Sequence, residues 1–201
     1  MHSPDAPLVV MALPAEGEGL FEAEGIPVLY TGIGKVNAAI ALTRRFTEYI
    51  ERGQPLPLVV NFGSAGSGTF PSGTLVSCSE FVQRDMDVQP LGFEIGVTPF
   101  EDIPKVLRFN VAIPGLPHGV CGSGDSFATQ LVGIQCDVVD MEAYALAKVC
   151  WVFGAQFACA KFISDGADHA AASDWTKNHH RGATGFLSAY RALLAAYRPT
   201  P

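Results

Sequence analysis

Acidic side chains follow three apolar segments of this sequence, where they could transfer protons or bind a polar ligand. They are Glu16 after residues 8–13, Asp140 and Glu142 after 136–139, and Asp165 after 157–163. A carboxylate among apolar residues is costly to bury unless it has a partner or a function. In open α/β sheets, ligands bind beyond the carboxyl ends of the strands, so these positions favour contact with a ligand.

A structural role competes with this interpretation for each acid taken singly. An acid at the start of a helix accepts hydrogen bonds from free N–H groups and interacts favourably with the helix dipole. Asp140 fits that role best, because it stands where an N-cap would begin a helix at Met141. The recurrence of acids after successive strands favours Glu142 and Asp165 as ligand contacts.

Apolar runs alternate with helical patterns along the chain and indicate the elements that position these acids. Strands are predicted at residues 8–13, 27–31, 58–62, 74–82, 136–139 and 157–163. Most of these runs are too uniformly apolar to have one face in water, so they need cover on both faces. Helical spacing of apolar residues predicts helices at 36–50, 141–153 and 184–197. The pattern predicts an α/β fold, a three-layer αβα sandwich with a central mixed sheet.

Composition and charge narrow the class of protein. The chain has 201 residues, of which 48% are hydrophobic and 16% charged, which favours a single domain over residues 1–201. A net charge of -7 argues against a nucleic-acid partner, because phosphate backbones are bound by clustered Lys and Arg. Residues 1–5 do not form an export signal, and no apolar run reaches membrane-spanning length. We expect a cytoplasmic protein with no membrane partner.

Cysteines, histidines and glycine loops give no sign of a metal or a cofactor. The cysteines are odd in number and form no C-x-x-C pair, which is typical of reduced core thiols; they are Cys78, Cys121, Cys136, Cys150 and Cys159. Cys and His lack zinc spacing. The glycine loops at 31–35 and 61–68 lack the spacing of a P-loop or a dinucleotide fingerprint, so tight turns are favoured. Ser64 is not in a G-x-S-x-G elbow and has no evident His partner.

Six short motifs occur in an order that carries a family resemblance. They are ALPAE at 12–16, TGIGKV at 31–36, NFGSAG at 61–66, SGDSF at 123–127, VDME at 139–142 and ISDGAD at 163–168. The chain resembles the nucleoside phosphorylases and nucleosidases, most closely the bacterial 5'-methylthioadenosine/S-adenosylhomocysteine nucleosidases. The resemblance implies a purine nucleoside phosphorylase-like fold and cleavage of the N-glycosidic bond of a purine nucleoside.

The resemblance also implies a role for residues that match the family's motifs. Asp165 matches the acid that protonates purine N7, and Ser164 matches its orienting neighbour. Glu142 matches the acid that binds the ribose hydroxyls, and Met141 matches the residue that packs beside the ribose. An acid that assists a leaving group in this way contributes roughly 10²- to 10⁴-fold in rate.

The last residue of the SGDSF motif and the residue that follows it would then contact the base. Phe127 matches the aromatic residue that stacks on the purine, and the Ala128 backbone is expected to face the base edge. Simple core packing of Phe127 is the alternative interpretation.

The attacking group separates a hydrolase from a phosphorylase. A phosphate site needs donors, ideally Arg. The resembled phosphorylases place arginines in the first turn and before the Gly-Ser loop, whereas this chain has residues 14–16 and Asn61-Phe62 there. Glu16 would repel phosphate but can take a proton from water. We therefore expect hydrolysis, with Glu16 as general base and Ser64 helping to hold the water.

Three departures from the family concern the sugar's 5' substituent and the neighbourhood of the acid. The chain is shorter than the usual nucleosidase in its middle region. Lys161 stands where the resembled enzymes carry an Arg near the catalytic acid, so the resemblance implies that it contacts the substrate. Leu91 and Phe93 match positions that offer apolar residues across a homodimer interface to the 5' group. The segment 173–175 is interpreted either as a lid over the pocket or as a surface helix with a packed tryptophan.

Alternatives to the hydrolase remain open at the level of sequence. They are a phosphate-dependent purine nucleoside phosphorylase, a futalosine-type nucleosidase and a non-catalytic nucleoside-binding protein. The presence of both Glu16 and Asp165 argues against the last, because a pure binder needs no acid and base on either side of one bond.

Overall fold

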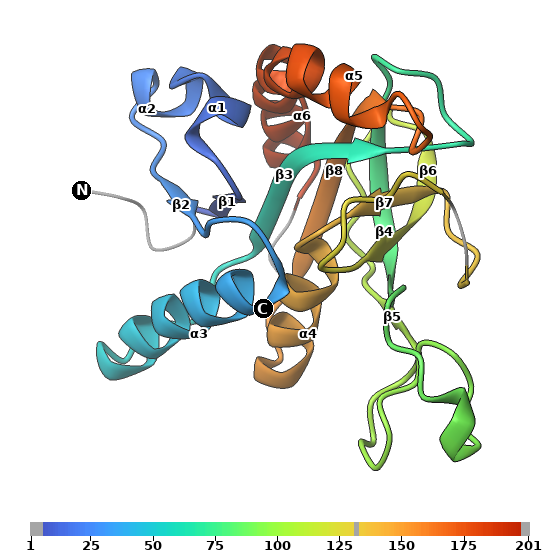
Figure 1. The fold of residues 1–201 in the computed structure, drawn as a ribbon. Helices are drawn as coiled ribbons and strands as arrows, with labels where there is room; N and C mark the ends of the chain where they lie inside the picture. Colours follow the sequence, from blue (N-terminus) through green and yellow to red (C-terminus); the bar gives the residue numbers. More distant parts are fainter. Residues whose placement is uncertain (1–5, 131–132, 198–201) are drawn as a thin grey trace.

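Eight strands and six α-helices make up the part of the chain that the computed structural model describes, residues 6–130 and 133–197 (Figure 1). The strands are β1 Leu8–Met11, β2 Val28–Tyr30, β3 Val59–Gly66, β4 Leu75–Gln83, β5 Val106–Arg108, β6 His118–Ser123, β7 Val138–Asp140 and β8 Phe157–Asp165. The helices are α1 Pro14–Gly17, α2 Leu20–Ala23, α3 Lys35–Glu51, α4 Ala143–Phe153, α5 Ala171–Asn178 and α6 Ala183–Ala196, with 3-10 turns η1 Gln89–Leu91 and η2 His179–Gly182. The expectation for residues 1–5 lies outside the described residues.

The strands form one mixed sheet that closes on itself in part. Its order is β2-β1-β3-β7-β6-β4-β5, and β8 pairs with both β3 and β4. The pairs β1·β3 and β3·β8 are parallel, whereas β4·β8 is antiparallel. At the end of β3, Gly66 pairs with Val139 of β7. The pairing β3–β8–β4–β6–β7–β3 is therefore a closed circuit of strands.

Helices cover both faces of the sheet, which confirms the predicted three-layer architecture. Residues of α3 and α4, such as Leu42 and Leu146, belong to one core cluster with the strands. Residues of α6, such as Phe186 and Leu193, belong to a second cluster with β1, β3 and β8. Figure 1 shows α3 and α4 together on one side of the sheet and α6 on the other. Two covered faces explain why the strands are apolar almost throughout.

The structure corrects several sequence-based boundaries. Residues 61–66, expected in a tight turn after a strand, continue β3, and the turn follows them. The α4 helix begins at Ala143 rather than at Met141. β5 and β6 lie where the sequence predicted no strands. β5 has only three residues, and the two glycines of β6 interrupt its apolar alternation.

None of the helices in the described ranges is long and apolar enough to span a membrane.

Candidate active site

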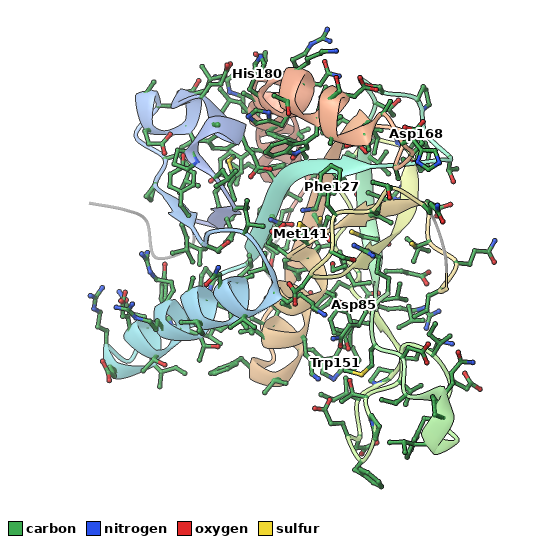
Figure 2. All side chains as sticks on the ribbon, viewed as in Figure 1. Asp85, Phe127, Met141, Trp151, Asp168 and His180 are labelled. Atoms are coloured by element: carbon green, nitrogen blue, oxygen red, sulfur yellow. The ribbon has the colours of Figure 1, made fainter. Side chains whose placement is uncertain are left out.

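A cavity of about 490 Å³ opens at the carboxyl ends of β1, β3 and β8. These three strands are parallel, so their ends lie at the same edge of the sheet. The cavity is lined by most of the residues that the sequence singled out, namely Glu16, Ser64, Phe127, Ala128, Met141, Glu142 and Asp165. Figure 2 shows Phe127 and Met141 near each other in the middle of the molecule, beneath β3 and α5.

Glu16 lies on the short helix α1 and is held by four hydrogen-bond donors. Its Oε2 accepts bonds from the backbone N–H groups of Ala12 and Leu13, each at 3.1 Å. Its Oε1 accepts bonds from the backbone N–H of Ser64 at 2.8 Å and from Ser64 Oγ at 3.1 Å. The side chain is buried, yet it lines the cavity. The four hydrogen bonds fix the orientation of the Glu16 carboxyl group at the cavity wall.

Asp165 is the last residue of β8 and lies against the end of β3. Its Oδ2 accepts a bond from Ser164 Oγ at 2.8 Å, and its Oδ1 accepts one from the Ala167 N–H at 3.0 Å. A Cβ on Gly66 would lie only 2.6 Å from Oδ1, so this close approach requires glycine. Burial raises the pKa of Asp165 above its usual value. A buried carboxyl group of this kind can retain a proton and donate it.

Asp140 and Glu142 have separate environments although only one residue stands between them. Asp140 Oδ2 accepts a bond from the Ala143 N–H at 2.9 Å at the start of α4. The same oxygen lies 2.7 Å from Lys161 Nζ. Burial would raise the pKa of Asp140, but the charge of Lys161 lowers it below its usual value. Asp140 is therefore a structural anion that anchors the helix and pairs with a cation.

Glu142 lines the cavity and has no cation paired with it among the described residues. Its Oε1 accepts a bond from the Gly34 N–H at 2.8 Å, which joins it to the GIGK turn. Burial, followed by the charge of Asp140, raises its pKa to about 8. At neutral pH, a carboxyl group with this pKa holds a proton and can donate as well as accept a hydrogen bond.

Lys161, expected to contact the substrate, does not line the cavity. It is 1% exposed, and its ammonium group is turned toward Asp140. A Cβ on Gly63 would lie 3.1 Å from Lys161 Nζ and 3.2 Å from Glu16 Oε1. The ammonium group therefore lies beneath the cavity wall, close to the Glu16 carboxyl group. Burial of β8 on both faces explains this position, because every residue of the strand is buried.

Three further residues that the sequence predicted to bind substrate do not line the cavity of this chain. Ser164 is fully buried behind Asp165. Leu91 and Phe93 belong to the segment between β4 and β5, which projects from the sheet (Figure 1). Leu91 is 71% exposed.

Two cavity residues have contacts that the sequence did not reveal. Arg84, directly after β4, donates to Ser126 O and to Ser126 Oγ beside Phe127. Trp175 of α5 lines the cavity, and its Nε1–H donates to Ser64 Oγ at 3.0 Å. The position of Arg84 after an apolar run is a signal that could have been read, whereas the Trp175 contact depends on tertiary packing alone. Of the two interpretations of residues 173–175, the structure favours a cover over the cavity.

Comparison with known proteins gives concordant results. Residues 125–196 match the family model described as the phosphorylase superfamily. A 5'-methylthioadenosine/S-adenosylhomocysteine nucleosidase of Marinomonas is 32% identical over 169 residues, covering 73% of this chain and 71% of that protein. One from Shewanella baltica is 31% identical over 204 residues, covering 91% of this chain and 84% of that protein.

Solved structures show the same fold. The 5'-methylthioadenosine/S-adenosylhomocysteine nucleosidase of Helicobacter pylori superposes with a TM-score of 0.82 at 20% identity, covering 98% of this chain and 100% of that one. The native futalosine hydrolase of Helicobacter pylori superposes with a TM-score of 0.83 at 20% identity and the same coverage.

Proposed function

Because this chain belongs to the 5'-methylthioadenosine/S-adenosylhomocysteine nucleosidase family of the phosphorylase superfamily, we propose that it hydrolyses the N-glycosidic bond of a purine nucleoside. The products would be the free purine base and a ribose derivative. The observation that carries the proposal is that Glu16, after β1, and Asp165, at the end of β8, line one cavity from either side of β3. They contact positions two residues apart on β3, Ser64 and Gly66, which lie roughly 7 Å apart along a strand.

Departure of the base is assigned to Asp165. The bond breaks as positive charge develops on the ribose, and the leaving purine needs a proton at N7. Burial raises the pKa of Asp165, which favours the protonated form that a general acid needs. Ser164 Oγ, bonded to Oδ2, orients this carboxyl group.

Substrate binding is assigned to residues around the same cavity. Phe127, which is 44% exposed, stacks on the purine, and the Ala128 backbone faces the base edge. Glu142 binds the ribose hydroxyls, and Met141 packs beside the sugar. Positive charge that develops on the ribose favours the ionised form of Glu142, and the resulting carboxylate stabilises that charge.

The scarcity of basic side chains at the cavity supports water rather than phosphate as the attacking group. Among the described residues, Arg84 is the one basic side chain that lines the cavity. Its guanidinium group already donates to Ser126. A phosphate would also be repelled by the carboxylate of Glu16, which is buried at the cavity wall. Glu16 instead takes a proton from water that Ser64 helps to hold.

The test is a base-release assay with methylthioadenosine, adenosylhomocysteine, inosine, adenosine and futalosine, each with and without phosphate. Hydrolysis predicts equal base release in both conditions and a free ribose product. Strict dependence on phosphate, with a ribose 1-phosphate product, would instead identify a phosphorylase. Binding without base release from any nucleoside would identify a non-catalytic binder.

A homodimer is proposed to complete the site. Apolar side chains lie exposed at the rim and along the adjoining face of α3, namely Ile33, Val36 and Ile40, exposed by 46%, 66% and 55%. Ile33 itself lines the cavity. An exposed apolar stripe that continues into a cavity favours cover by a second copy, with Leu91 and Phe93 reaching the 5' group of the substrate in the partner's site.

Size-exclusion chromatography with light scattering measures the molar mass in solution and so tests for the dimer. Val36→Glu is expected to give a monomer with reduced activity, because it places a charge in the proposed interface. Ile50→Glu is the matched control, since Ile50 is 54% exposed at the other end of α3. A monomeric wild type with full activity would contradict the proposal.

A further inference from the structure

Trp175 is joined to the Glu16 carboxyl group through one intervening side chain. The indole Nε1–H donates to Ser64 Oγ at 3.0 Å, and Ser64 Oγ donates to Glu16 Oε1 at 3.1 Å. The residues come from α5, β3 and α1, so the contacts link three separate elements at the cavity wall. The functions assigned above to Glu16 and Ser64 make no use of the indole.

The chemistry of the three groups fixes the direction of the hydrogen bonds. An indole N–H can only donate, and a hydroxyl group has one proton and two lone pairs. With a lone pair of Ser64 Oγ occupied by Trp175, the hydroxyl proton is free to point at Glu16. An orientation of this proton toward the indole is disfavoured, because the indole N–H is a donor and offers no acceptor. Trp175 therefore selects the Ser64 rotamer that donates to Glu16.

The indole is itself held in place by aromatic neighbours. The His179 ring stacks on it with a centroid distance of 4.5 Å and an interplanar angle of 20°. The Phe127 ring meets it edge-on at 6.4 Å. His179 Nδ1 is 2.9 Å from the Trp175 carbonyl oxygen, which fixes this pair at the end of α5. The ring that contacts Ser64 thus also contacts the aromatic residue assigned to the purine.

We propose that Trp175 is a positioning residue for the hydrolytic reaction: its indole N–H orients Ser64, and through Ser64 the Glu16 carboxyl group, toward the attacking water. The inference rests on the proposed function of Glu16 as general base. The inference also assigns a role to α5. The position of this helix over the cavity determines the orientation of Ser64 and Glu16, the residues proposed to activate water. The same residue, Trp175, therefore both covers the cavity and orients the general base.

A double-mutant cycle between Trp175→Phe and Ser64→Ala tests the proposal. Trp175→Phe keeps an aromatic ring against His179 and Phe127 but removes the donor. With Ser64 present, it is expected to lower kcat about 3- to 10-fold, the usual effect of one neutral hydrogen bond, with KM changed less than about 2-fold. In the Ser64→Ala background, the same substitution is expected to change kcat less than about 2-fold. Trp151→Phe is the matched control and is expected to leave kcat and KM unchanged, since Trp151 is on α4 and packs against Phe109.

Equal losses of kcat from Trp175→Phe in both backgrounds would show that the ring acts by packing and would overturn the proposal. A change confined to KM would overturn it too, because it would assign Trp175 to substrate binding. An unchanged kcat in the Trp175→Phe variant would show that the N–H is not needed.

Fluorescence separates failure of this inference from failure of the proposed function. Trp175 is the only tryptophan left in the Trp151→Phe variant, because the chain contains two. Adding Ser64→Ala is expected to shift its emission maximum to shorter wavelength as the indole loses its hydrogen-bond acceptor. An unshifted emission maximum would overturn the Trp175 contact even in an active enzyme. A shifted maximum in a protein that releases no base would leave the contact standing and overturn the proposed function.

Discussion

Lys161 Nζ lies 2.7 Å from Asp140 Oδ2, and both side chains are 1% exposed. Burial would lower the pKa of Lys161, but the charge of Asp140 raises it well above its usual value, so the pair is ionised. Ser123 and Cys121 of β6 also contact Asp140. The ion pair thus joins β6, β7 and β8 inside the closed circuit of strands, beneath both Glu142 and Glu16.

Removal of one partner should leave an unpaired charge in a site without water. We expect Lys161→Met to lower the free energy of unfolding by about 3–5 kcal/mol, because Asp140 then remains buried without its cation. Denaturant unfolding measures this change. Lys105→Met is the control, since Lys105 pairs with Glu94 at the surface, where side chains are 34% and 79% exposed, and a loss of less than about 1 kcal/mol is expected. Similar losses in the two variants would contradict a structural role for the buried pair.

Loss of the proposed acid should reduce turnover more than binding. Asp165→Asn is expected to lower kcat roughly 10²- to 10⁴-fold, because the amide cannot protonate purine N7. Binding of the purine should change little, as measured by calorimetry with the free base. Because the pKa of Asp165 is raised, wild-type kcat should fall on the alkaline side as this carboxyl group loses its proton. Near wild-type turnover in the variant would rule out Asp165 as the acid.

Glu142 should make stability depend on pH in the neutral range. Folding raises its pKa to about 8, from an unfolded value of about 4.3, so the folded state binds this proton more tightly. The stabilisation is complete below about pH 4 and is lost as pH rises toward the folded value. Relative to Glu142→Gln, wild-type unfolding free energy should fall by up to roughly 1.4 kcal/mol per pH unit between about pH 5 and 8.

Unfolding curves at several pH values check this difference. Glu51→Gln is a suitable control, because Glu51 is exposed at the end of α3 and should track the wild type. Parallel pH dependence in wild type and Glu142→Gln would argue against a buried, protonated Glu142.

A methyl group at Gly66 should disable the site with a limited effect on folding. The added Cβ would lie 2.6 Å from Asp165 Oδ1 and 3.1 Å from Ala167 Cβ, so the Asp165 carboxyl group must move. We expect Gly66→Ala to abolish most base release and to cost about 1–3 kcal/mol of stability from overpacking. Circular dichroism and unfolding curves separate the two effects.

Gly185→Ala on α6 is the matched substitution. Its Cβ would meet Leu75 Cδ2 at 3.6 Å, an ordinary contact, in a helix. It should retain activity and raise stability by about 0.5–1 kcal/mol. Full activity in Gly66→Ala would show that Asp165 does not need its observed position.

The sequence predicted the layers from local pattern, and it predicted several cavity residues from acids that follow strands and from the family resemblance. Uniformly apolar strands imply cover on two faces, and acids after strands meet at one sheet edge, as Glu16 and Asp165 do. The inward orientation of the Lys161 side chain could not be predicted from the local sequence. It depends on the pairing of β8 with strands on both sides and on the ion pair between Lys161 Nζ and Asp140. The hydrogen bond of Trp175 to Ser64 likewise joins residues far apart in the chain.

The pairing of Gly66 with Val139 has a consequence for the order in which the protein folds. It joins two distant stretches of chain, and it closes the strand circuit that brings Glu142 to the same cavity as Ser64 and Asp165. Contacts between distant segments carry a large loop-closure cost and tend to form slowly, whereas α3 and α6 can form early from local contacts. In a refolding experiment, helical signal should therefore recover before activity, and enzymatic turnover should serve as the marker of the last step of assembly.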